Sequence, residues 1–208
     1  WSRDQWCEAT IRGITTERLA VLIAFVRPNV AIRERDLQQA NTSDVREVLH
    51  ANLEFWVYKT TEKTADNTLC RYDTEHKITD NSIFFKRYDG KSQRVPALFK
   101  GNFINWNEDS DIPDALEIYK KDDGHGNYTF HSFEVYEYAG KNHACAVVSV
   151  LKFGNMTPEG TVTERELRLN GSALENPMAD QDCWDRFNYI LQNLSLTANS
   201  HYSEACKL

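Results

Sequence analysis

The sequence predicts an all-β domain with one helix before the strands and one after them. Between residues 55 and 169, short segments rich in aromatic and β-branched residues recur along the chain. Turn-forming pairs such as Asp89-Gly90 separate these segments. About eight short strands joined by turns of this kind indicate an antiparallel barrel or a sandwich.

The two helices are predicted from capping residues and apolar spacing. The first is expected in residues 41–53, where the N-cap candidates are Asn41, Thr42, Ser43 and Asp44. Glu47 lies four positions after Ser43 and three after Asp44, close to a capping box. Its apolar positions have helical spacing: Val45, Val48, Leu49 and Leu53. The second is predicted over residues 183–191, where one face carries Trp184, Phe187 and Leu191.

Nine segments between these helices are strand candidates because aromatic and β-branched residues dominate them or alternate in them. They are residues 55–61, 70–72, 82–88, 94–99, 102–106, 116–119, 128–138, 144–153 and 161–169. Among the turns, Lys100-Gly101 is expected to separate the fourth candidate from the fifth. The order is therefore helix, many strands, helix, and residues 41–208 are predicted to form one domain.

Residues 1–40 differ from this domain. Arg12 and Arg18 precede an apolar run over residues 19–26, which is too short to span a bilayer and is typical of a secretory leader. We interpret residues 1–40 as a leader or an upstream extension outside the fold. The alternative is a buried helix or strand of the mature protein.

Four of the five cysteines lie inside the predicted domain: Cys70, Cys145, Cys183 and Cys206. Cys7 lies in the extension, so the domain keeps an even number, which indicates two disulfides and an oxidising compartment. A bridge from Cys206 would fix a C-terminus that otherwise frays. Four cysteines allow three pairings, and the residues alone do not choose among them.

Glycosylation signals also point to a secreted protein, and the net charge limits its partners. Five N-x-S/T sequons have no proline at the middle position: Asn41, Asn127, Asn155, Asn170 and Asn193. We therefore expect a secreted, extracellular glycoprotein. The net charge of −7 disfavours nucleic acid and anionic membranes as partners.

The sequence contains none of the common catalytic motifs, such as H-E-x-x-H, G-x-S-x-G or a P-loop. Its six histidines are scattered without metal-ligand spacing. We therefore predict a protein that is not an enzyme and that has no cofactor and no metal.

Carboxylates alternate with aromatic residues on several predicted strands, so each strand places a mixed set on one face. These sets are Glu117 with Tyr119, Glu134 with Tyr136 and Tyr138, and Glu164 with Glu166 and Arg168. If the apolar set faces inward, the charged set is a solvated outer face. If the charged set faces a barrel interior, a buried carboxylate beside aromatic rings suits an ammonium group. A buried arginine instead favours a carboxylate or a phosphate.

Three segments carry a resemblance to a known family. They are residues 52–61 before Cys70, residues 133–138 before Cys145, and residues 165–168 followed by residues 183–189 and Cys206. Over residues 41–208 the chain resembles the tick salivary lipocalins typified by the histamine-binding proteins. The resemblance implies an eight-stranded antiparallel lipocalin barrel with an N-terminal and a C-terminal helix. It also implies the bridges Cys70–Cys206 and Cys145–Cys183, and the capture of host biogenic amines such as histamine and serotonin.

The chain departs from this family at two informative positions. Glu166 matches the acid of the family's E-L-W motif, but Arg168 stands where the tryptophan would be. Ala146 stands where a histamine binder has an acid, so one of two amine sites looks dismantled. The expected ligand-binding set is Glu166, Tyr119, Arg168, Glu117, Tyr136, Glu134 and Tyr58.

Two other functions remain open. Arg168 and the missing acid at Ala146 suit a lipid mediator, either a leukotriene or a fatty acid. An interaction glycoprotein with a closed barrel is the third possibility. We expect a monomer. If it binds an amine or a lipid mediator, its partner is a small molecule.

Overall fold

The structure of the protein is a computed structural model that describes residues 44–52, 54–63, 70–90, 95–107, 110–124, 126–153 and 161–206. The expectations for residues 1–40, for Cys7 and for the sequons at Asn41 and Asn155 lie outside these ranges.

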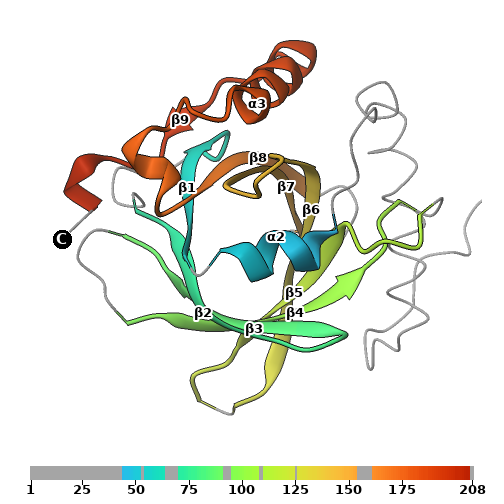
Figure 1. The fold of residues 1–208 in the computed structure, drawn as a ribbon. Helices are drawn as coiled ribbons and strands as arrows, with labels where there is room; N and C mark the ends of the chain where they lie inside the picture. Colours follow the sequence, from blue (N-terminus) through green and yellow to red (C-terminus); the bar gives the residue numbers. More distant parts are fainter. Residues whose placement is uncertain are drawn as a thin grey trace, which may run out of the picture. The chain divides into compact units, whose positions relative to one another are not determined.

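Eight antiparallel strands close into a barrel (Figure 1). They are β1 (Glu54–Thr60), β2 (Tyr72–Ile78), β3 (Ser82–Tyr88), β4 (Ala97–Ile104), β5 (Ala115–Lys121), β6 (Tyr128–Ala139), β7 (Cys145–Phe153) and β8 (Thr161–Asn170). Each strand pairs with the next, and β1 pairs with both β8 and β2, which closes the sheet. The predicted all-β barrel is confirmed. A short strand near the C-terminus, β9 (Asn199–Ser200), pairs with β1.

The prediction of two strands separated by a turn at Lys100-Gly101 is wrong. One strand, β4, runs through both residues, and Gly101 pairs with Ile83 on one side and Ile118 on the other. A Cβ at Gly101 would lie 3.0 Å from the Ile83 side chain and 3.1 Å from that of Ile118. The glycine therefore lets three strands pack closely inside the barrel and does not form a turn.

The prediction for the second strand was also too short, since β2 begins at Tyr72 and continues to Ile78. The sequence of β2 is mostly polar, and Asp73 occupies a position that faces the barrel interior opposite Arg87. Charged residues on the inner face removed the apolar alternation on which strand prediction depends.

The first helix, α2 (Val45–Ala51), lies across one end of the barrel (Figure 1). The Asp44 side chain accepts a hydrogen bond from the Arg46 backbone N–H at 2.9 Å, so the predicted N-cap is confirmed. Val45, Val48 and Leu49 are buried and join the apolar core. The helix thus closes this end of the barrel with apolar side chains.

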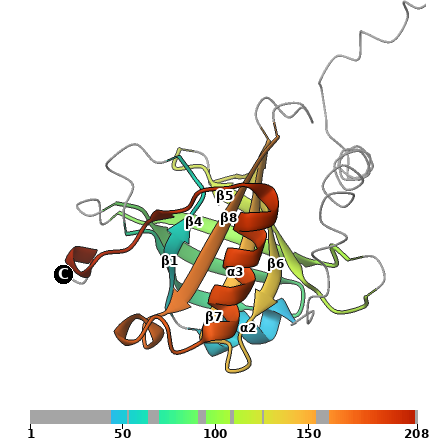
Figure 2. The same ribbon diagram turned by 90° about the horizontal axis from the view of Figure 1, so that it is seen from above.

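The second helix, α3 (Gln181–Leu194), packs outside the barrel against β6, β7 and β8 (Figure 2). It buries Cys183, Trp184, Phe187 and Ile190, so its contact face includes Ile190 where Leu191 was predicted. No helix among the described residues is long and apolar enough to cross a membrane.

Two disulfides join distant parts of the chain, and their pairing is the one that the family resemblance implies. Cys145–Cys183 ties α3 to the start of β7, and Cys70–Cys206 ties the C-terminus to the residue two positions before β2. The second bridge spans 136 residues. Both therefore hold C-terminal segments against the barrel.

The position of α3 decides which face of β8 points inward. Leu167 and Leu169 lie on the outer face, where the helix packs, and both are buried. The alternate residues of the same strand, Glu166 and Arg168, therefore face the barrel interior. The barrel thus has an apolar interior beside α2 and a charged interior further along its axis.

Candidate functional site

Arg168 is the centre of a group of ion pairs inside the barrel. Its side chain is 2% exposed, and the carboxylates of Glu134 and Glu166 that contact it are each 1% exposed. The Arg168 Nη1 lies 2.7 Å from Glu134 Oε2, and its Nη2 lies 2.6 Å from Glu166 Oε2. The two acids come from different strands, β6 and β8, so the guanidinium joins them across the interior.

Arg87 of β3 extends this group on one side. Its Nε and Nη2 each donate to one oxygen of the Asp73 carboxylate at 2.7 Å, and Nη2 also lies 2.8 Å from Glu134 Oε1. The guanidinium carbon lies 5.4 Å from the ring centre of Phe85 and 5.0 Å from that of Phe99. Cation–π attraction therefore supports a geometry that the bidentate ion pair already orients.

Arg71, just before β2, extends the group on the other side. It donates to Glu166 at 3.0 Å and to Glu62 at 2.9 Å, and its Nε lies 3.4 Å from Asp89. Lys152 of β7 then contacts Glu62 at 3.1 Å and Glu164 at 2.7 Å. The ion pairs are therefore continuous from the middle of the barrel to the end opposite α2, which no described helix covers and which we call the open end.

Burial and ion pairing act in opposite directions on the buried acids. Burial by itself raises the pKa of Glu134, but the charges of Arg168 and Arg87 lower that pKa well below its usual range. The pKa of Glu166 is lowered in the same way by Arg168 and Arg71. For Glu164 burial prevails over Lys152, so the pKa of this carboxyl is raised. Of these three acids, Glu164 is therefore the one that takes up a proton most readily.

A cavity of about 380 Å³ lies at the end of the barrel opposite α2. This volume falls in the range of roughly 300–1,000 Å³ typical of small-molecule sites. The described residues that line it are Glu62, Arg71, Arg87, Asp89, Val95, Ala97, Phe99, Lys120, His131, Val150, Lys152 and Glu166. Burial and the charge of Arg87 lower the pKa of His131 to about 4, so its imidazole is neutral at physiological pH. The cavity therefore combines ion-paired charges with aromatic and aliphatic walls.

The structure brings four of the seven predicted ligand residues into the barrel interior. Glu134, Glu166 and Arg168 contact one another there, and Tyr136 belongs to the neighbouring apolar core. Of these, only Glu166 lines the cavity directly. Glu134 and Arg168 lie behind it and set its charge.

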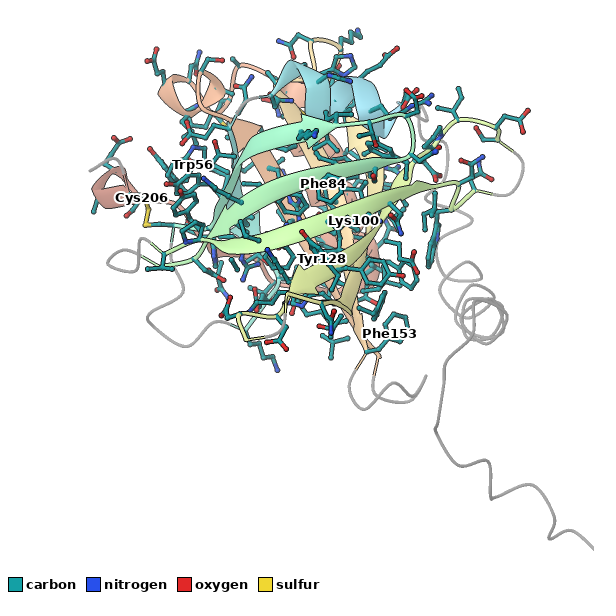
Figure 3. The ribbon with its side chains drawn as sticks, turned by 90° about the horizontal axis from the view of Figure 1, so that it is seen from below. Trp56, Phe84, Lys100, Tyr128, Phe153 and Cys206 are labelled. Carbon is teal, nitrogen blue, oxygen red and sulfur yellow. A yellow bond between two sulfur atoms is a disulfide. The ribbon has the colours of Figure 1, made fainter. Side chains whose placement is uncertain are left out.

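The other three predicted ligand residues lie on the outer face, so their expected place in the cavity is wrong. Tyr119 pairs across the sheet with Lys100, which Figure 3 shows on the outer side of the barrel together with Phe84. Glu117 alternates with the inward-facing Leu116 and Ile118 and also points outward. Tyr58 lies at a bulge of β1 and contacts Trp184 of α3.

Sequence reasoning missed the basic residues Arg71, Arg87 and Lys152. Arg87 had a usable signal, because in β3 it alternates with Ile83 and Phe85 on one face, and both of those residues are buried. Arg71 lies outside the regular strands, so no alternation pointed to it.

Ala146 lies directly opposite Arg168 in the pairing of β7 with β8, and both side chains are buried. A small residue here leaves room for the long guanidinium side chain. The two departures from the family pattern are therefore neighbours in space.

Three carboxylates could be considered for a metal, because Glu62, Glu164 and Glu166 bring one oxygen each within 4.8 Å of one another. However, Lys152 Nζ lies 3.1 Å from Glu62 and 2.7 Å from Glu164, and Arg71 lies 3.0 Å from Glu166. Basic side chains already contact these oxygens and a metal ion would have to displace them, so the group does not fit a metal site.

No protein-family model matches the chain, and no curated protein matches it. Among solved structures it is similar to the siderocalin Ex-FABP, described as functioning through dual ligand specificities, with 7% identity and a TM-score of 0.48 over 74% of this chain and 91% of that one. Lobster apocrustacyanin A1 is 10% identical with a TM-score of 0.43, over 79% and 88% of the two chains. A bovine odorant binding protein is 11% identical with a TM-score of 0.47, over 74% and 95%. No function is taken from these likenesses.

Proposed function

We propose that this chain is a secreted, non-enzymatic binding protein that captures a small organic cation, a biogenic amine such as histamine or serotonin, in the cavity at the open end of its barrel. The observation that carries the proposal is the charge balance of the connected ion pairs. Among the described residues they join six acids to four bases: Glu62, Asp73, Asp89, Glu134, Glu164 and Glu166 with Arg71, Arg87, Lys152 and Arg168.

This excess of acids favours a cationic ligand. Lys120 also lines the cavity, and the network with Lys120 then has six acids and five bases. The wall itself carries three acids and four bases, so the excess of acid comes from Asp73, Glu134 and Glu164 behind the wall. Glu62 lines the cavity and shares the single ammonium group of Lys152 with Glu164, so a ligand ammonium placed against Glu62 would gain a carboxylate partner whose charge is balanced only in part. Phe99 and His131 supply aromatic surface for the rest of an amine.

Secretion is supported by independent features. Two disulfides are typical of proteins that fold in an oxidising compartment. Of the described sequons, Asn127 and Asn193 are exposed and Asn170 is half-buried. Asn127 and Asn193 are therefore the better glycosylation sites.

Calorimetric titration with histamine and with serotonin at neutral pH tests this function. We expect binding at micromolar concentration or tighter, and a loss of at least about tenfold in affinity in the variant Glu62→Gln, which removes a charge from the cavity wall; this loss corresponds to about 1.4 kcal/mol. Glu47→Gln is the matched control, because this acid is 70% exposed on α2 at the other end of the barrel. No heat with either amine would reject the proposal.

A lipid mediator is the second candidate, because Arg71 and Arg87 line the cavity beside the apolar side chains of Phe99, Val150 and Ala97. The same titration with a leukotriene and with a long-chain fatty acid separates the two classes. Binding of either acid with no amine binding, and its loss in Arg71→Gln, would replace the first proposal with this one. If neither class binds, an interaction glycoprotein remains.

A further inference from the structure

The barrel wall has a seam between β1 and β2 that these two strands close only in part. They pair through Glu54, Phe55 and Trp56, which is the half of β1 nearer α2. In the other half, Lys59 and Thr60 pair with β9. The C-terminal residues therefore form part of the wall at the open end, beside the cavity.

His201, the residue after β9, is bonded to both sides of this seam. Its backbone N–H donates to the Tyr58 carbonyl at 3.0 Å, and its carbonyl accepts from the Cys70 N–H at 2.8 Å. We call residues 195–206 the strap. Cys145–Cys183 holds α3 just before the strap, and Cys70–Cys206 holds its far end. The strap can therefore leave the seam without leaving the molecule.

The His201 side chain is unusual for a buried imidazole. It is 0% exposed, and neither ring nitrogen has a hydrogen-bond partner among the described residues. The charged groups that act on it come from four segments of the barrel: Arg71 before β2, Glu62 after β1, Asp89 after β3 and Glu166 in β8. All four of these residues line the cavity. The imidazole is thus packed directly behind the cavity wall.

We propose that the strap is a pH-sensitive gate of the ligand cavity: it closes the seam while His201 is neutral and leaves the seam when His201 takes up a proton. An open seam exposes Arg71 and Glu166 from the side and gives a ligand a second way out. The inference deepens the proposed function, because it adds a means of release to the same cavity.

The direction of the pH effect follows from the difference in the pKa of His201 between the closed and the open strap. Burial, and after it the charge of Arg71, lower the pKa of His201 below its ordinary value of 6.5. Glu166, Asp89 and Glu62 act in the opposite direction but do not prevail. Above about pH 6.5 both forms are neutral and closure is favoured in full. Below this pH the open form binds a proton more readily, so closure weakens by up to about tenfold per pH unit until the lowered pKa is reached.

Hydrogen exchange of the ligand-free protein tests the gate. The protection factors of the Cys70 and His201 amides, corrected for intrinsic exchange, should fall by up to about fivefold between pH 6.5 and 5.5. The Tyr136 amide donates a hydrogen bond of 2.9 Å to the Asp114 carbonyl, in a part of the barrel away from the strap. This amide should keep its protection. In His201→Phe the protection of Cys70 should no longer depend on pH, and His201→Leu serves the same purpose if the first variant does not fold.

The variant His131→Gln should keep the pH dependence of the wild type, because His131 faces the cavity and not the seam. The gate would be overturned if the protection of the Cys70 and His201 amides did not change between pH 6.5 and 5.5. It would also be overturned if the protection of Cys70 fell equally in His201→Phe. This experiment contains no ligand, so its outcome does not depend on which molecule binds. Failure of amine binding would instead appear in the titration and would leave the exchange result intact.

Discussion

Arg168 shows how a single residue determines the character of the cavity. Its guanidinium is removed from water, which is costly by itself, but it lies within 2.7 Å of two carboxylates that are buried as deeply. These acids are further held by Arg87 and Arg71. A buried ion pair of this kind loses far more when one partner is removed than it contributes as a whole, because the remaining charge stays buried.

Replacing Arg168 with methionine should therefore lower the free energy of unfolding by about 3–5 kcal/mol, since Glu134 and Glu166 would keep their burial and lose their shared partner. Urea denaturation measures this change. The control is Lys141→Met, because the Lys141 side chain is 87% exposed and its contact with Asp182 is 4.0 Å long. An Arg168→Met protein as stable as the wild type would contradict the central role of this residue.

At the scale of elements, β4 and α3 set what the interior contains. The passage of β4 through Gly101 brings Ile83 and Ile118 together, which fills the apolar half of the barrel. On the opposite wall, α3 covers the outer apolar residues of β8 and so turns Glu166 and Arg168 inward. A helix outside the barrel thus decides the polarity inside it.

Gly101→Val should lower the free energy of unfolding by about 1–3 kcal/mol, because the added carbons would meet Ile83, Ile118 and Leu116 in a filled interior. Thermal or urea unfolding measures the loss. The same change at Gly124 is the matched control, since this glycine is exposed and the nearest atom to its added Cβ is 3.8 Å away. Equal losses at the two positions would mean that the interior beside β4 is not closely packed.

At the scale of the whole molecule, the barrel has one closed end and one open end. Apolar side chains of α2 and of the neighbouring strands fill the closed end, whereas ion pairs and the cavity occupy the open end. The disulfides attach α3 and the C-terminus to the outside of this barrel, and Figure 3 shows Cys206 near Trp56 of β1. Cys70–Cys206 lies next to Arg71 of the cavity wall, whereas Cys145–Cys183 lies at the start of β7, near the end that α2 closes.

Removal of either disulfide by paired serine substitutions should destabilise the protein, and more strongly for the longer loop. Chain entropy gives about 4 kcal/mol for Cys145–Cys183 and about 5 kcal/mol for Cys70–Cys206. Denaturation of the two double variants under non-reducing conditions measures both losses. Loss of the second bridge should also lower the exchange protection of the Cys70 position at neutral pH, whereas loss of the first should not. The reverse pattern would show that α3, and not the strap, supports the seam.

The sequence by itself determined the kind of fold, because local signals are sufficient for it. Turn residues and aromatic or β-branched runs located most of the strands, and Asp44 capped α2 as expected. The pairing of the four cysteines followed from the family resemblance and not from spacing. The strand β2 and the continuity of β4 were missed, because charged inner residues and a packing glycine do not follow the local rules.

Only the tertiary structure decided which face of each strand points inward. Strand alternation defines two sets of residues but not which of them faces the interior, and α3 made that choice for β8 by covering Leu167 and Leu169. Glu166 and Arg168 therefore face the barrel interior, whereas Glu117, Tyr119 and Tyr58 lie outside it. The meeting of Arg71, Arg87 and Lys152 with six acids also depends on closure of the barrel, because these residues come from segments far apart in the chain. The charge balance of these ion pairs is therefore a property of that closure.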